Sequence, residues 1–127
     1  MDTNLLNDIL KEYNWLDLEV KSFIDDKLLI IAAEDLTYSD DLEIIFTGVT
    51  YVQVGKTWTW TKESTFLEIV YPDVFTDPAL KSYIYENYYT KGTTLFKFLG
   101  SENQSYYVIA NSVSFSKKSM RYKQSTD

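Results

Sequence analysis

The side chains of this chain that are best suited to chemistry are carboxylates in predicted turns. Asp25-Asp26 and Asp40-Asp41 are adjacent pairs, and Asp35 lies shortly before the second pair. Carboxylates can act as general acids and bases or bind hard cations. The stretch 35–41 lacks the alternating acids, central glycine and final glutamate of a helix–loop–helix calcium site. These aspartates therefore predict solvated turns, with no bound metal.

Two residue types that are common in catalytic and metal-binding sites are missing from the chain. The chain contains no histidine and no cysteine, which excludes Ser-His and Cys-His nucleophile pairs, disulfides and thiolate metal sites. Gly48 and Gly55 stand alone, so there is no glycine-rich phosphate loop. We expect no catalytic residue, no cofactor and no enzymatic activity.

Trp58 and Trp60 are the sharpest candidates for contact with a ligand. They alternate with threonines and so share one face of a predicted strand. Two tryptophans on one face could stack on a sugar or anchor a protein partner. The alternative, which we prefer, is that both rings cover the core and that the threonine face of the strand is exposed to solvent. A carbohydrate or small-ligand binding module using Trp58 and Trp60 stays open as a second functional hypothesis.

The net charge of −7 is unevenly distributed. Residues 1–50 carry twelve acidic residues and three lysines, residues 51–100 carry five of each sign, and residues 101–127 carry two acids and four bases. Nucleic acids and anionic membranes are bound through lysine and arginine, so neither is an expected partner. The acidic first third is compatible with a basic protein partner, or with solubility alone.

A partner-binding rim would form if the two acidic turns met at one end of a sheet. Its field would speed the capture of a basic protein. Tyr38, inside the second turn, is the natural apolar anchor. The alternative is a solvated rim without a partner. The predicted partner-binding residues are Asp25, Asp26, Asp35, Tyr38, Asp40 and Asp41.

The stretch 42–61 is the element around which these turns must be arranged. It is rich in β-branched and aromatic residues and predicts two long strands that turn at Gly55-Lys56. Its start is apolar on both faces, which predicts a central strand with Ile45 among the inaccessible inward residues. Gly48 predicts a bulge or a bend within the run.

Two helices are expected. Residues 3–13 carry an apolar stripe opposite a polar face. Asp77-Pro78 supplies an N-cap followed by proline at the first helical position, which predicts a second helix near residues 77–90 that ends before Gly92. Residues 82–85 also alternate as a strand would, so a strand is the competing interpretation of this segment.

Further strands are predicted over 16–24, 27–34 and 65–71, and a final hairpin over 93–99 and 105–115. The strand at 27–34 is apolar on both faces and is expected to be central. Together these elements predict one domain over residues 1–127. Its fold class is α+β, with a single antiparallel sheet of about six to eight strands carrying the two helices. Residues 117–127 are polar and basic and are expected to form a flexible tail.

The chain begins with an acidic segment, and its longest apolar run is residues 28–33. Neither is typical of a signal peptide or a membrane-spanning helix. We therefore expect a cytoplasmic protein.

Two segments resemble a pattern seen among small bacterial proteins of unknown function or of toxin-immunity type. The first is Tyr13-Asn14-Trp15-Leu16-Asp17-Leu18-Glu19-Val20, and after the strand at Leu28 the second is Ile44-Ile45-Phe46-Thr47-Gly48-Val49. In that pattern a Trp-His-Asp-like step follows the first helix and a Phe-x-Gly-Val strand comes later. The resemblance covers roughly residues 5–55, and Leu16 stands where the histidine would be. It implies a single-domain binder that acts beside a secreted toxin.

The first functional hypothesis is thus a small acidic cytoplasmic binding protein, an immunity protein that blocks the active site of a toxin. The second is the ligand-binding module built on the tryptophans. The third is a structural or assembly protein without a small ligand, either a monomer or a dimer formed through an edge strand.

Overall fold

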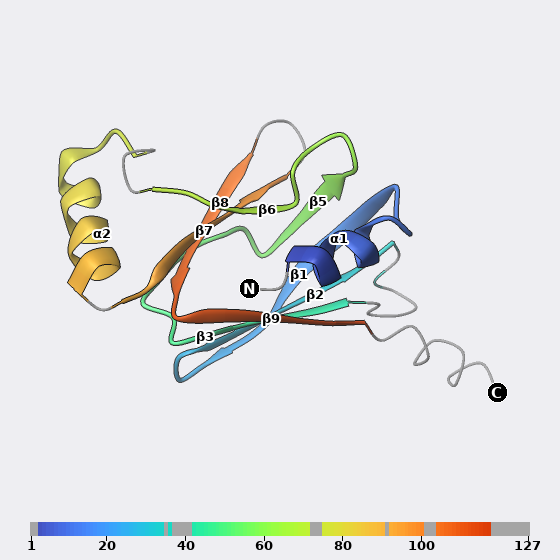
Figure 1. The fold of residues 1–127 in the computed structure, drawn as a ribbon, viewed down its shortest axis with the longest axis horizontal. Coiled ribbons are helices and arrows are strands. Elements are labelled where there is room, and N and C mark those ends of the chain that lie inside the picture. Colours follow the sequence, from blue (N-terminus) through green and yellow to red (C-terminus); the bar gives the residue numbers. More distant parts are fainter. Residues whose placement is uncertain are drawn as a thin grey trace.

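A computed structural model of the chain describes residues 3–34, 36, 42–71, 75–90, 92–100 and 104–117. Over these residues it contains nine strands and two short helices (Figure 1). In chain order the elements are α1 (Thr3–Leu10), β1 (Trp15–Ile24), β2 (Lys27–Ala33), β3 (Leu42–Thr47), β4 (Tyr51–Gln53), β5 (Thr57–Thr61), β6 (Leu67–Ile69), α2 (Pro78–Thr90), β7 (Thr94–Leu99), β8 (Ser105–Ala110) and β9 (Ser112–Lys117).

The strands form two antiparallel sheets. A five-stranded sheet has the order β5-β1-β2-β3-β9, and a four-stranded sheet has the order β4-β8-β7-β6. The expected combination of antiparallel strands and two helices is confirmed, but the expectation of a single sheet is wrong. The predicted central position of residues 27–34 is confirmed, because β2 is the middle strand of the five.

Two bent strands join the sheets. β3 and β4 run on from each other through Gly48, and β8 and β9 run on through Asn111. β3 pairs with β9 in the first sheet, and β4 pairs with β8 in the second. The pairing continues across the bend, where Asn111 N donates to Thr47 O at 2.9 Å and Thr50 N donates to Ile109 O at 2.9 Å. The predicted bend at Gly48, which has φ 70°, is confirmed.

The prediction of a hairpin over 42–61 is wrong, because the strands on either side of Gly55-Lys56 belong to different sheets. β4 belongs to the four-stranded sheet, whereas β5 pairs with β1 in the five-stranded sheet, with Leu18 opposite Trp58. Gly55-Lys56 therefore connects two sheets. The predicted hairpin of the last strands is right for β7 and β8, but the run 105–115 breaks at Asn111 and its second half leaves as β9.

The main core lies between the inner faces of the two sheets. Phe46 of β3 is fully buried, and its ring centroid lies 5.2 Å from that of Phe96 and 5.8 Å from that of Phe98, both edge to face. α1 contributes to the same core through its apolar stripe. Other buried members are Leu6, Ile9, Leu16, Leu18, Leu28, Ile30, Leu42, Ile44 and Val108.

A smaller core lies on the other face of the four-stranded sheet, beneath α2, which Figure 1 shows at the far end of the molecule. Ile84 of the helix is fully buried with Leu95 and Ile109 of the sheet. Asp77 Oδ1 accepts a hydrogen bond from Ala79 N at 3.0 Å, which caps the helix. The predicted helix near 77–90 is thus confirmed, and the strand interpretation of its middle is wrong.

The last described strand, β9, lies beside α1 and the segment that follows it. The helix ends at Leu10, three residues earlier than expected, and Tyr13 is buried just after it. Lys117, the last residue of β9, forms an ion pair with Glu12. The segment expected to be a tail thus begins inside a strand, and residues 118–127 lie outside the described part of the chain.

Candidate functional site

On the outer face of the five-stranded sheet, exposed apolar side chains lie next to charged ones. The described helices and the four-stranded sheet pack elsewhere, since α1 joins the inner core and α2 lies on the other sheet. The outer face is closed near the end of β2, where Ile31 and Ala33 are buried. It is open toward the β1–β2 turn.

A shallow pocket of about 370 Å³ lies on this open part. Leu29 and Ile45 are directly opposite each other on β2 and β3 and form its half-buried floor. Ile24 is 68% exposed and forms one wall. The pocket is lined by Ser22, Ile24, Asp25, Asp26, Lys27, Leu29 and Ile45.

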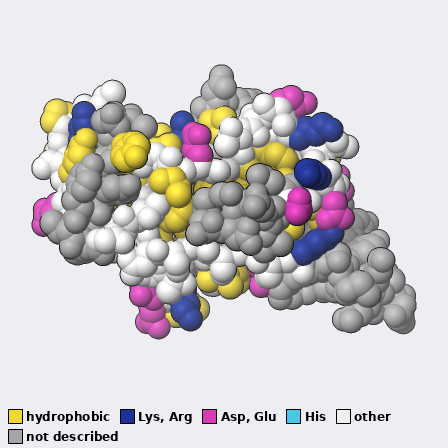
Figure 2. All heavy atoms as spheres, viewed as in Figure 1, with side chains coloured by type: hydrophobic (Ala, Val, Ile, Leu, Met, Phe, Trp, Pro, Cys, Tyr) yellow, Lys and Arg dark blue, Asp and Glu magenta, His cyan; other side chains and the backbone are white. Residues whose placement is uncertain are grey.

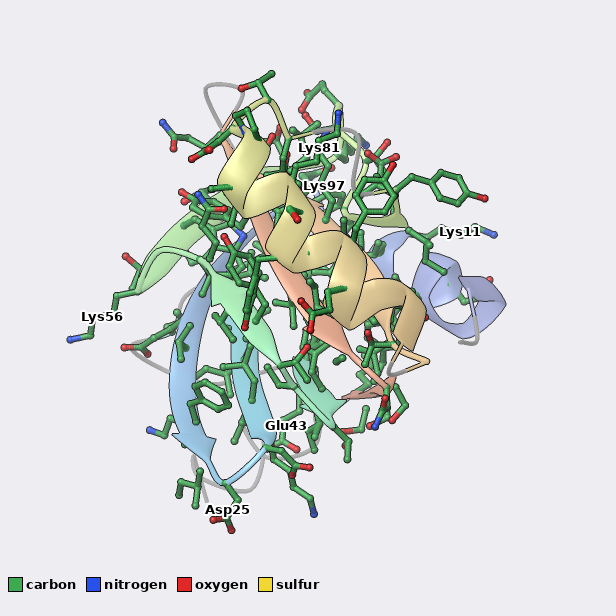
Figure 3. All side chains as sticks on the ribbon, turned by 90° about the vertical axis from the view of Figure 1, so that its left-hand side faces the viewer. Lys11, Asp25, Glu43, Lys56, Lys81 and Lys97 are labelled. Atoms are coloured by element: carbon green, nitrogen blue, oxygen red, sulfur yellow. The ribbon has the colours of Figure 1, made fainter. Side chains whose placement is uncertain are left out.

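The rim of the pocket is the two-residue turn Asp25-Asp26, which connects the paired residues Ile24 and Lys27. Asp25 has φ 58°, a left-handed conformation that aspartate adopts more readily than most residues. Val49 N donates to Asp26 O at 3.0 Å and so ties the turn to the bend after β3. Figure 3 shows Asp25 projecting from the tip of this hairpin. The carboxylates are therefore presented on an anchored turn.

Acidic side chains continue along the outer face beyond the pocket. Asp17 and Glu19 lie on it from β1, and Glu43 lies on it from β3, opposite Ile31. Asp17 Oδ1 accepts a hydrogen bond from Thr59 Oγ1 at 2.7 Å, which links β1 to β5. At the turn, Figure 2 shows acidic, basic and hydrophobic side chains together at the lower left of the molecule. This face thus combines exposed apolar area with an excess of carboxylates.

The structure places two of the six predicted partner-binding residues. Asp25 and Asp26 line the pocket. Asp35, Tyr38, Asp40 and Asp41 lie outside the described residues, so the predicted meeting of the two acidic turns stays a prediction.

Sequence reasoning missed the apolar part of the pocket. Ile45 was expected to point inward, and this is wrong, because Ile44 is the fully buried residue and Ile45 lies half-buried on the outer face. The run Ile44-Ile45-Phe46 is apolar on both faces. This pattern fits a strand that is buried on both faces, and it equally fits a strand with one buried face and one apolar face exposed to solvent. Ile24, directly before a charged turn, was the available signal.

Trp58 and Trp60 belong to the main core, which confirms the preferred interpretation. They are 7% and 4% exposed. The Trp58 ring lies 4.9 Å from that of Tyr106, and the Trp60 ring lies 5.3 Å from that of Phe66. Neither indole presents a free face on which a sugar could stack.

The described residues contain no group of three acidic side chains that could hold a metal ion. Among the described residues, Glu63 and Tyr51 have clearly shifted pKa values, and neither residue lines the pocket. A hydrogen bond with the Thr61 side chain, helped by a backbone hydrogen bond, lowers the pKa of Glu63. Burial, with Tyr83 and Tyr107 nearby, raises the pKa of Tyr51.

None of the described helices has the length and apolar character needed to cross a membrane. Comparison of the whole chain with protein-family models, with curated proteins and with solved structures finds no match in any of the three.

Proposed function

We propose that this chain is a small acidic protein-binding protein that holds a basic protein partner on the outer face of its five-stranded sheet. The observation that carries the proposal is the apolar pocket of Ile24, Leu29 and Ile45 beneath the carboxylates of Asp25 and Asp26. The function is non-catalytic and needs no cofactor.

The apolar part of the pocket supplies the driving force for association. Burial of exposed apolar surface stabilises a complex by about 25 cal/mol per Å². Ile24 is 68% exposed. Large exposed apolar groups rimmed by polar residues are typical of protein-interaction surfaces. A partner that inserts one apolar side chain between Ile24 and Ile45 would remove this surface from water.

The charges select the partner. Asp25 and Asp26 border the pocket with Lys27 as the sole basic residue of its lining, and Glu19 and Glu43 extend the acidic surface. A negative field of this kind steers a cationic protein into contact and discriminates against an acidic one. The matching surface on the partner carries lysine or arginine around an apolar side chain.

The proposed biological role is that of a bacterial immunity protein, an antitoxin that acts in the cytoplasm by covering a toxin's active site. The sequence resemblance implies this role, and the anchored turn suits it. A surface that blocks a partner binds more tightly when it is already in its bound conformation. The hydrogen bond from Val49 N to Asp26 O restricts the turn in this way.

The test is capture of a partner from the secreted proteins of the producing cell, followed by an assay of whether the chain neutralises that partner's toxicity. We expect wild type to retain a basic protein at low salt. The double variant Asp25→Asn/Asp26→Asn should bind more slowly and lose most of its salt dependence, because the steering field is removed. Ile24→Ser should raise the dissociation rate.

The matched control is Glu86→Gln, which neutralises an exposed acid on α2, away from the pocket. It should bind as wild type does. Capture of an acidic partner, equal capture by all the variants, or capture without neutralisation would each contradict the proposal.

A further inference from the structure

The strand β6 lies at one edge of the four-stranded sheet. It pairs with β7 on one side, and none of the described strands pairs with its other side. Val70, which follows β6, continues the register, and its N–H donates to Leu95 O at 3.0 Å. In an antiparallel ladder alternate residues face the neighbouring strand, so the N–H and C=O groups of Leu67 and Ile69 point away from β7. These groups form an open backbone edge.

Exposed apolar side chains accompany this edge. Ile69 is 50% exposed and Tyr71 is 64% exposed. The two are two positions apart in an extended segment and therefore lie on the same face. The single charged residue of 65–71 is Glu68, whose carboxylate lies 3.7 Å from Lys97 Nζ of β7. Natural edge strands are commonly protected from pairing by charged side chains, and here the one charge is neutralised by a neighbour.

The other edge strands of the two sheets differ from β6 in their side chains. Those strands are β5 and β9 in the first sheet and β4 in the second. Of the four described edge strands, β6 alone carries a large hydrophobic side chain that is exposed.

The outward side of β5 is also approached by the chain itself. A Cβ built on Gly55 would lie 3.3 Å from Thr57 O, and one built on Gly100 would lie 3.5 Å from Thr59 O. The edge at β6 is therefore the one best suited to pairing with another strand.

We propose that β6 pairs antiparallel with β6 of a second copy of this chain. Backbone N–H and C=O groups at alternate positions are matched by another extended backbone, so the occupant of this edge is a polypeptide strand. A second copy supplies such a strand with the same exposed isoleucine beside it. Two-fold symmetry makes each contact twice and joins the two four-stranded sheets into one continuous sheet.

The pattern of side chains favours one register for this pairing. When Ile69 lies opposite Ile69 of the second copy, Leu67 lies opposite Tyr71, so apolar residues meet on the exposed face. Glu68 then lies opposite Val70. A register centred on Glu68 would place two carboxylates directly opposite each other, which destabilises a strand pair.

Salt distinguishes this dimer from the proposed complex with a basic protein. Each copy carries a net charge of −7, so the copies repel each other and screening by salt should strengthen the dimer. Capture of a basic partner on the five-stranded sheet should instead weaken with salt. The two proposals concern different sheets and can fail separately.

The test is sedimentation velocity of the full chain over a dilution series at low and high salt. Because the contact is short, we expect a reversible monomer–dimer equilibrium in which the dimer fraction rises with protein concentration and with salt. Hydrogen exchange at the same concentrations should show slower exchange of the Leu67 and Ile69 amides as the dimer forms. The Val70 amide, which already donates to Leu95 O, should change less.

Charge-swap variants test the register. Ile69→Lys and Ile69→Glu should each stay monomeric, because like charges would meet at the centre of the strand pair. An equal mixture of the two variants should recover the dimer, which a mere folding defect could not produce. Ile24→Lys is the matched control, since Ile24 is an exposed isoleucine on the other sheet, and it should self-associate as wild type does.

Three results would each overturn the proposal. The first is a wild-type chain that stays monomeric throughout the series, including one whose β6 amides are protected only by a strand of a different protein. The second is an Ile69→Lys variant that dimerises as wild type does. The third is a mixture of the two charge variants that stays monomeric.

Discussion

Gly48 and Asn111 lie against each other at the point where the two bent strands pass from one sheet to the other. A Cβ built on Gly48 would lie 2.9 Å from Asn111 Cβ and closer still to Cγ and Nδ2 of the same side chain. Gly48 also has φ 70°, a conformation that side chains with a Cβ rarely adopt. The junction of the sheets therefore requires glycine for two separate reasons.

The first prediction is that Gly48→Ala lowers the free energy of unfolding by about 2–5 kcal/mol, as backbone strain and steric overlap add. Gly92→Ala is the matched control, because Gly92 has φ 64° but nothing within 4 Å of its would-be Cβ. It should cost only the strain, about 1–2 kcal/mol. Urea denaturation measures both values.

Adding Asn111→Gly to Gly48→Ala should recover the steric part of the loss and leave the strain. A double-mutant cycle isolates this coupling. If Gly48→Ala costs no more than Gly92→Ala, the close approach at the junction is wrong.

The second prediction compares two neighbours on β3. Ile44 is fully buried between the sheets, so Ile44→Ala should cost about 2–5 kcal/mol by leaving a cavity. Ile45 is half-buried on the outer face, and Ile45→Ala should cost about 1 kcal/mol because water can fill the space. Chemical denaturation of the two variants gives the order, and equal losses would contradict the assignment of faces.

The third prediction concerns tryptophan fluorescence. Trp58 and Trp60 are buried, whereas Trp15 is 38% exposed. Iodide should therefore quench the Trp15 emission and hardly affect the other two. In Trp15→Phe the native emission should shift to shorter wavelength and become nearly insensitive to iodide. Strong quenching that persists in this variant would show that the core tryptophans are accessible.

The fourth prediction is alkaline destabilisation through Tyr51. Because burial raises the pKa of this phenol above its unfolded value of 10.0, the folded state favours the neutral form. The resulting contribution to stability is complete below about pH 10 and is lost as the pH rises through the higher folded-state pKa. Tyr51→Phe should reduce the fall in stability between about pH 8 and about pH 11, measured by urea denaturation. An equally steep fall in Tyr51→Phe would assign the effect to other groups.

Local patterns predicted several elements correctly, because their causes lie within a few residues. Asp77-Pro78 specifies a helix start through a cap and a fixed φ. The alternation of Leu16 and Leu18 with acidic residues specifies which face of β1 is buried. Likewise, the doubly apolar run 28–33 predicted the middle strand of a sheet, because apolar residues on both faces are typical of strands away from the sheet edges.

The residues of the candidate site were likewise predicted only in part. The sequence alone identified Asp25 and Asp26, since paired aspartates before a new strand predict an exposed turn. It could not identify Leu29 and Ile45 as the pocket floor, because these residues meet only through the register of β2 with β3.

The sequence by itself determined the strand-forming segments, the two helices, the acidic first third and the absence of histidine and cysteine chemistry. Only the tertiary structure decided that there are two sheets. A period-two pattern reads the same whichever strand lies alongside, so it specifies faces but not partners. The partners are set by the bends at Gly48 and Asn111, which send β4 and β9 to different sheets from their sequence neighbours β5 and β8.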